Sequence, residues 1–133
     1  MIRSKLCFAA AAIIRDGESN IISAFNVFEG LVPTGLPLFL QQVSCFALWQ
    51  RDDGDPQQVS GNFTATLDGD TLANARILVD FAGLRRSRSI VNMQGFVVPR
   101  SGVLQFRFVL ETGATAEYSL DIDPPPAVAA QAR

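Results

Sequence analysis

The side chains best suited to chemistry lie in two aspartate-rich turns. Their carboxylates belong to Asp52, Asp53, Asp55, Asp68 and Asp70. Clustered carboxylate oxygens can bind calcium or act as an acid and base pair in glycoside hydrolysis. Neither turn fits an EF-hand loop. When the loop is counted from Asp52 or Asp53, Phe63 and Thr64 occupy the positions where the closing glutamate would fall. Since aspartate beside glycine is also typical of tight turns, a purely structural role stands beside the calcium hypothesis.

The absence of histidine limits the catalytic options. Because the sequence contains no histidine, a Ser-His-Asp or Cys-His nucleophile is impossible and the commonest metal ligand is missing. A zinc site is therefore not expected, and paired carboxylates are the remaining option for an enzyme. Because no set of residues identifies a reaction, we predict a non-enzymatic protein without a cofactor.

The one dense group of positive charge is an arginine-rich connection that contains Arg85, Arg86 and Arg88. Guanidinium groups match the geometry of phosphate and carboxylate, so these residues predict an anion site or a contact with an acidic partner. The alternative is a solvated strand edge whose charges discourage aggregation. With a net charge of -2 and no aromatic residues nearby for base stacking, we expect no specific binding to nucleic acid and no attraction to an anionic membrane.

The elements that must position these groups are β-strands. In segment 104–110 every second residue is large and apolar, and the alternation returns in 116–122 after a turn at Thr112-Gly113. Successive side chains leave opposite faces of a strand, so these two segments predict a hairpin with one buried and one solvent-exposed face. Turns and loops rich in glycine and proline separate six further strand candidates, 6–14, 21–28, 38–49, 59–67, 75–81 and 91–97. With no convincing helix, the pattern predicts an all-β, two-sheet β-sandwich of about eight strands.

The length favours one domain over residues 1–123, followed by a tail. The chain of 133 residues suits a single core, and its ten phenylalanines can sustain that core, since burying one such side chain contributes about 1.5–3 kcal/mol. Trp49 is expected to fill the core with its N–H bonded to a partner, and a ligand platform is the alternative. In 91–97, Val91, Met93 and Val97 are expected to share one face. Segment 124–133 begins with three prolines, which predict an extended, polyproline-like tail outside the core.

The first residues imitate a secretory signal. Two basic residues precede the apolar run 6–14, but charged residues follow it without a small-residue cleavage site, and the run is too short to cross a bilayer. A cytoplasmic protein is therefore expected. The alanines of this run also suit a helix, yet that helix would lack a polar face, so we predict a strand. Cys7 and Cys45 are expected to be free thiols, and a disulfide between them is the alternative.

The first strands are apolar on both faces, which suggests a contact surface. If the even-numbered residues of 6–14 face the core, the odd-numbered ones form a flat outer stripe that two residues of 21–28 extend. The predicted interface consists of Cys7, Ala9, Ala11, Ile13, Ile22 and Ala24. Because exposed apolar patches tend to mark contact surfaces, we predict self-association or docking through this stripe. The alternative is that loop 31–37 or the C-terminal tail covers it.

Several short motifs follow one another along the chain. They are Leu6-Cys7-Phe8-Ala9, Arg15-Asp16-Gly17, the run 21–28, Pro37 before a long strand, and Leu67-Asp68-Gly69-Asp70. Their order resembles that of a family of small bacterial β-sandwich proteins of unknown function. The resemblance implies a compact sandwich of immunoglobulin-like or jelly-roll type, with no enzymatic residues to carry over. It does not extend to true immunoglobulin domains, whose cysteines and tryptophan follow a Cys, Trp, Cys order that this chain lacks.

Two functions remain as hypotheses. The first is a non-enzymatic structural or interaction subunit that self-associates or docks through its first strands, as a homo-oligomer or within a larger assembly such as a virion or an injection-type particle. The second is a ligand- or calcium-binding module that uses the aspartate turns. The first requires a protein partner, and neither requires nucleic acid or a membrane.

Overall fold

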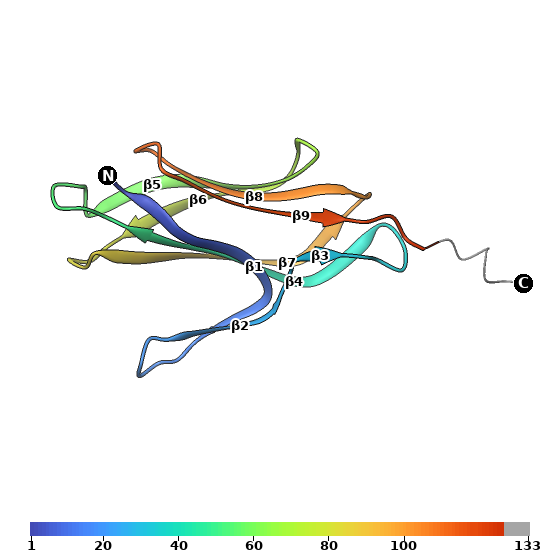
Figure 1. Ribbon diagram of the computed structural model, residues 1–133, viewed down its shortest axis with the longest axis horizontal. Helices are drawn as coiled ribbons and strands as arrows, with labels where there is room; N and C mark the ends of the chain where they lie inside the picture. The colour runs from blue at the N-terminus through green and yellow to red at the C-terminus, as the bar shows by residue number, and fades with distance from the viewer. Residues whose placement is uncertain (127–133) are drawn as a thin grey trace, which may run out of the picture.

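Two β-sheets pack face to face in the computed structural model, which describes residues 1–126 (Figure 1). The nine strands are β1 (Arg3–Arg15), β2 (Ile22–Val27), β3 (Gly30–Leu31), β4 (Leu38–Gln50), β5 (Gln58–Leu67), β6 (Asp70–Asp80), β7 (Arg86–Val98), β8 (Gly102–Leu110) and β9 (Thr115–Ile122). No helix occurs among the described residues, so the predicted all-β sandwich is confirmed. The strand beyond the expected eight is β3, whose two residues are too few to show any alternation.

The strand orders are β2-β1-β4-β7 in one sheet and β3-β9-β8-β5-β6 in the other. All pairs are antiparallel except β3 with β9. The predicted final hairpin is present as β8 and β9, with Leu104 opposite Leu120 and Phe106 opposite Tyr118. Because alternate residues share a face, this register directs one apolar set of side chains toward the other sheet.

Aromatic side chains of the five-stranded sheet fill the core. The ring centroids of Phe63 and Phe108 lie 4.9 Å apart, and Phe106 lies 6.2 Å from Phe63. From the opposite sheet, Trp49 meets Phe108 edge-on at 6.4 Å, and its Nε1 donates to the Ser89 hydroxyl oxygen at 3.0 Å. Trp49 is therefore a core residue with a satisfied N–H, as expected, and is fully buried.

The inward face of β1 is the opposite of the predicted one. Cys7 and Ala9 point toward the core, paired with Ala47 and Cys45 of β4, whereas Leu6 is half exposed on the outer face. The reason is volume: the facing sheet contributes bulky phenylalanines, so small side chains are needed in β1 and β4 to pack the two layers closely. The predicted outer stripe is thus wrong for Cys7 and Ala9.

A change of face within β7 also differs from the prediction. Val91 and Met93 pack against the core, but Val97 is 45% exposed, and its neighbour Phe96 is buried instead. Gly95 has a φ of 64°, a left-handed conformation that glycine adopts without steric cost. The buried side chains change from one face to the other at this glycine, between Met93 and Phe96, so Val97 lies on the solvent side while the register with β4 continues unbroken.

The β1–β2 hairpin leaves the plane of its sheet. β1 pairs with β4 from Arg3 to Ala10 and with β2 from Ala10 to Arg15. In Figure 1 the strand bends where its partner changes, and the hairpin extends below β4 and β7 toward the lower left. The chain leaves β9 at the right of the same view. Of the predicted tail, residues 127–133 lie outside the described part of the chain.

Candidate functional site

A groove of about 870 Å³ lies between the outer face of the four-stranded sheet, the tip of the β1–β2 hairpin and the β6–β7 connection. Its floor is apolar and consists of Leu6, Phe46, Leu48 and Ile90. The hairpin contributes Arg15, Asn20 and Ile22, and the connection contributes a run of arginines at the start of β7. The groove thus joins three separate parts of the chain, and its volume lies in the range usual for ligand sites.

Strand register builds the floor. Leu6 pairs with Leu48, and Phe46 pairs with Phe8 on one side and with Ile90 on the other, so these side chains line up on one face. The rings of Phe8 and Phe46 stack at 5.0 Å. Phe46 is only 2% exposed, but Leu6 is 49% and Ile90 is 38% exposed. The floor therefore offers apolar surface that a bound molecule would bury.

Asn20 connects the hairpin tip to β7 by hydrogen bonding. Arg88 Nη2 donates to the Asn20 carbonyl oxygen at 2.5 Å, and Arg15 Nη1 donates to the Asn20 side-chain oxygen at 3.2 Å. Asp16 closes the turn by accepting from the Ser19 hydroxyl and from the Ser19 N–H at 2.9 Å, and these hydrogen bonds lower the pKa of Asp16. A tip held in this way keeps one wall of the groove in place.

The groove carries an excess of positive charge. Among the described residues, four arginines and one aspartate line it. Arg85 forms an exposed ion pair with Asp53 at 3.4 Å, while Arg86 has no ion pair within residues 1–126. Asp80 accepts a hydrogen bond from the Ala82 N–H at 2.9 Å. In a chain with a net charge of -2, this local excess favours an anionic ligand or partner.

The groove combines two predicted sets of site residues. Arg85, Arg86 and Arg88, predicted to bind anions, line it together with Ile22 from the predicted interface. The other interface candidates do not line it: Ala11, Ile13 and Ala24 lie along the hairpin, and Cys7 and Ala9 face the core. Sequence reasoning did not assign the floor residues, although the apolar character of both faces of the first strands was the signal that pointed to such a surface.

The first aspartate turn surrounds the amino group of Met1. Asp52 Oδ2 accepts from this amino group at 2.7 Å, and Asp52 Oδ1 lies 3.1 Å from Arg3 Nη1. These hydrogen bonds, of which that from Met1 has the largest effect, lower the pKa of Asp52 to about 2. Asp55 lies 2.9 Å from the same amino group, and Asp53 instead faces Arg85. The three carboxylates are therefore engaged with cations of the chain itself.

The second aspartate turn lies at the opposite end of β5. Asp70 pairs with Arg100 at 2.7 Å, and Asp68 accepts from the Val103 N–H at 2.9 Å. Within residues 1–126, no three potential metal ligands come together. The structure thus gives these carboxylates roles in turns and ion pairs and does not bring the five calcium candidates together.

Both cysteines are free thiols on the inward faces of β1 and β4. Burial raises the pKa of the Cys7 thiol to about 12, and burial likewise raises that of Cys45. Since the thiolate is the reactive form, we expect the native protein at pH 8 to react with a thiol reagent far more slowly than the protein unfolded in guanidinium. Release of the chromophore from Ellman's reagent measures the reaction rate, and rapid modification of either cysteine in the native protein would contradict the burial of the two thiols.

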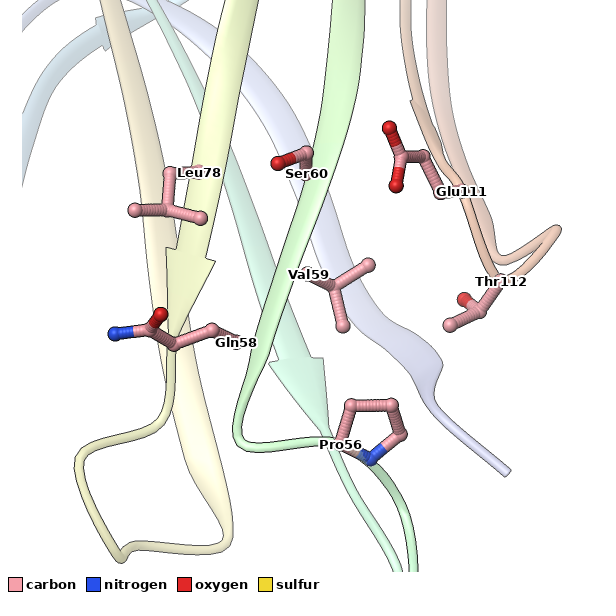
Figure 2. A pocket seen from close by; sticks show the side chains of 7 residues that line it. All are labelled: Pro56, Gln58, Val59, Ser60, Leu78, Glu111 and Thr112. Atoms are coloured by element: carbon pink, nitrogen blue, oxygen red, sulfur yellow. The ribbon is translucent and has the colours of Figure 1, made fainter.

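A second hollow, of about 370 Å³, lies on the five-stranded sheet (Figure 2). Its lining is Pro56, Gln58, Val59, Ser60, Leu78, Glu111 and Thr112. Glu111 is the one carboxylate among these residues, and it lies 3.6 Å from Arg76. A single exposed carboxylate without a second acid or base does not make a hydrolytic pair, so this hollow suggests no reaction.

In the part of the chain that the structure describes, no helix has the length and apolar character needed to span a membrane. No protein-family model and no curated protein matches this chain.

Proposed function

We propose that the protein is a non-enzymatic interaction subunit that binds an acidic segment of a protein partner in the groove on its four-stranded sheet. The observation that carries the proposal is the position of four arginines around a partly exposed apolar floor. The proposal keeps docking on the first strands but moves it from the stripe expected from the sequence to the face of β1 that carries Leu6 and Phe8.

Two physical effects favour such a ligand. Burying the exposed parts of Leu6 and Ile90 gains about 25 cal/mol for each Å² of apolar surface removed from water. Hydrogen bonds between guanidinium groups and carboxylates are stronger than neutral ones and give the ligand a defined orientation. A carboxylate between the arginines also reduces their mutual repulsion. An acidic segment with apolar side chains uses all of these effects.

The residues of the groove do not suggest catalysis. Asp80 is the one carboxylate that lines it within residues 1–126, and its Oδ1 already accepts the Ala82 N–H. Arginine remains protonated in proteins and is a poor general base. The groove therefore has groups that hold an anion, but no proton acceptor and donor pair beside them.

A labelled peptide tests the proposal. We expect a fluorescent peptide of alternating aspartate and leucine to bind with measurable anisotropy change, and a peptide with lysine in place of aspartate not to bind. Arg85→Gln with Arg86→Gln is expected to weaken binding at least about tenfold, since two charge-assisted contacts are lost, and added salt is expected to weaken it further.

Arg76→Gln is the matched control, because Arg76 is exposed on β6 of the other sheet and forms one exposed ion pair. It is expected to leave the affinity unchanged. Equal affinity for the aspartate and the lysine peptide would contradict the proposed function. So would an equal loss of affinity in Arg76→Gln and in the double variant.

A further inference from the structure

We infer that the acidic segment bound in the groove is Asp121–Pro126 of a second copy, so that copies associate head to tail. This inference rests on the proposed function of the groove and names its partner. Three properties of this segment support the contact: its position at the end of β9, its charge and its composition.

The segment leaves the molecule at the end opposite to the groove. β7 begins beside the groove with Arg86, which pairs with Gln50 at the end of β4. β9 ends with Ile122 at the far side, where Figure 1 shows the chain leaving the sandwich at the right, away from the hairpin tip. Residues 123–126 span at most about 14 Å, less than the roughly 26 Å of β9 itself. The segment therefore cannot fold back into its own groove.

The charge of this end complements the groove. Asp121 and Asp123 are exposed, and the neighbouring β3 begins next to exposed Glu29, since Gly30 pairs with Asp121. Within the described residues none of these three carboxylates forms an ion pair. One end of the molecule thus carries unneutralised negative charge, and the other carries the arginines that line the groove.

The composition of the segment suits an apolar floor. After Asp123 the chain continues with Pro124, Pro125 and Pro126, which are not part of any strand. Proline-rich segments lose little conformational entropy on binding and dock in grooves lined by aromatic and apolar side chains. We expect the prolines to lie over the exposed parts of Leu6 and Ile90. The side chains of Asp121 and Asp123, which stay in place at and just after the end of β9, are then expected to meet Arg85 and Arg86.

Such a contact does not pair identical surfaces. Each copy offers one groove and one acidic end, so every bound copy leaves a free groove at one end and a free segment at the other. Contacts of this kind produce rings if they close and open chains if they do not. The inference thus predicts assembly beyond a dimer, limited by concentration and weakened by salt.

Sedimentation velocity on the full chain tests the inference. The wild type is expected to sediment faster as its concentration rises, and added salt is expected to reverse this change. Two variants should each weaken self-association at least tenfold: Arg85→Gln with Arg86→Gln, which alters the groove, and Asp121→Asn with Asp123→Asn, which alters the segment. Arg76→Gln and Glu111→Gln are the controls, because Arg76 lies in β6 and Glu111 in the turn between β8 and β9, and neither lines the groove or belongs to segment 121–126.

Mixing the two altered proteins gives the sharpest result. The groove variant keeps an intact segment, and the segment variant keeps an intact groove, so an equal mixture is expected to form one-to-one pairs and nothing larger. Circular dichroism melting checks that both variants are folded, and each is expected to unfold cooperatively like the wild type. A peptide of residues 119–126 is expected to compete with assembly of the wild type.

The outcomes separate this inference from the proposed function. A wild type that stays monomeric at every concentration, but binds the aspartate–leucine peptide, overturns the inference and leaves the function standing. Assembly that the segment variant retains in full also overturns the inference. Absence of peptide binding in the wild type overturns the function and, with it, the head-to-tail contact.

Discussion

Replacing Phe63 by alanine is expected to destabilise the protein by about 3–5 kcal/mol, a large part of the stability usual for a single domain. Phe63 is 1% exposed, and its ring contacts those of Phe106 and Phe108 in the centre of the core. Truncation removes this apolar burial and leaves a cavity that the paired strands around it cannot close by a small shift. Urea unfolding followed by tryptophan fluorescence measures the change, because Trp49 is packed against Phe108.

Phe39→Ala is the matched control for this truncation. Phe39 is 64% exposed at the start of β4, so the same chemical change there is expected to alter the free energy of unfolding by no more than about 0.5 kcal/mol. A similar loss in both variants would mean that the core lies elsewhere.

Gly61→Ala is expected to destabilise the protein by about 3 kcal/mol, or to prevent folding, because the added methyl group has no room. A Cβ atom at Gly61 would lie 2.5 Å from the carbonyl oxygen of Val109 and 3.0 Å from the Cα of Leu110. Both atoms belong to the backbone of β8, which pairs with β5 at this point. The substitution can be accommodated only if the two strands separate, which disrupts hydrogen bonds in the middle of the sheet.

Gly17→Ala provides the comparison. No atom lies within 4 Å of a Cβ at Gly17, in the turn between β1 and β2, so this change is expected to be neutral or to stabilise by up to about 0.5 kcal/mol. The two midpoints of thermal unfolding, measured side by side, test the claim. Equal midpoints would show that β5 and β8 do not lie this close together at Gly61.

The arginines and the floor illustrate how far sequence reasoning reached for the candidate site. Arg85, Arg86 and Arg88 were recognisable as a charged group because they are neighbours in the chain. The floor of the groove was not recognisable from the sequence, because Leu6, Phe46 and Ile90 become neighbours only through the register of β1, β4 and β7. The hairpin wall depends on the bend of β1 and on the contact of Arg88 with Asn20, which joins residues far apart in the sequence.

The sequence by itself determined eight of the nine strands, the turns between them and the class of fold. The reason is that side chains of a strand alternate with a period of two, and polar residues mark the solvent-exposed face. In β5, β8 and β9 this was sufficient to identify the buried residues. Where both faces of a strand are apolar, the period shows which residues share a face but not which face is buried. In β1 and β4 the tertiary structure decided this, since the bulky phenylalanines of the opposite sheet left space for Cys7, Ala9 and Cys45 and directed Leu6 and Phe46 outward.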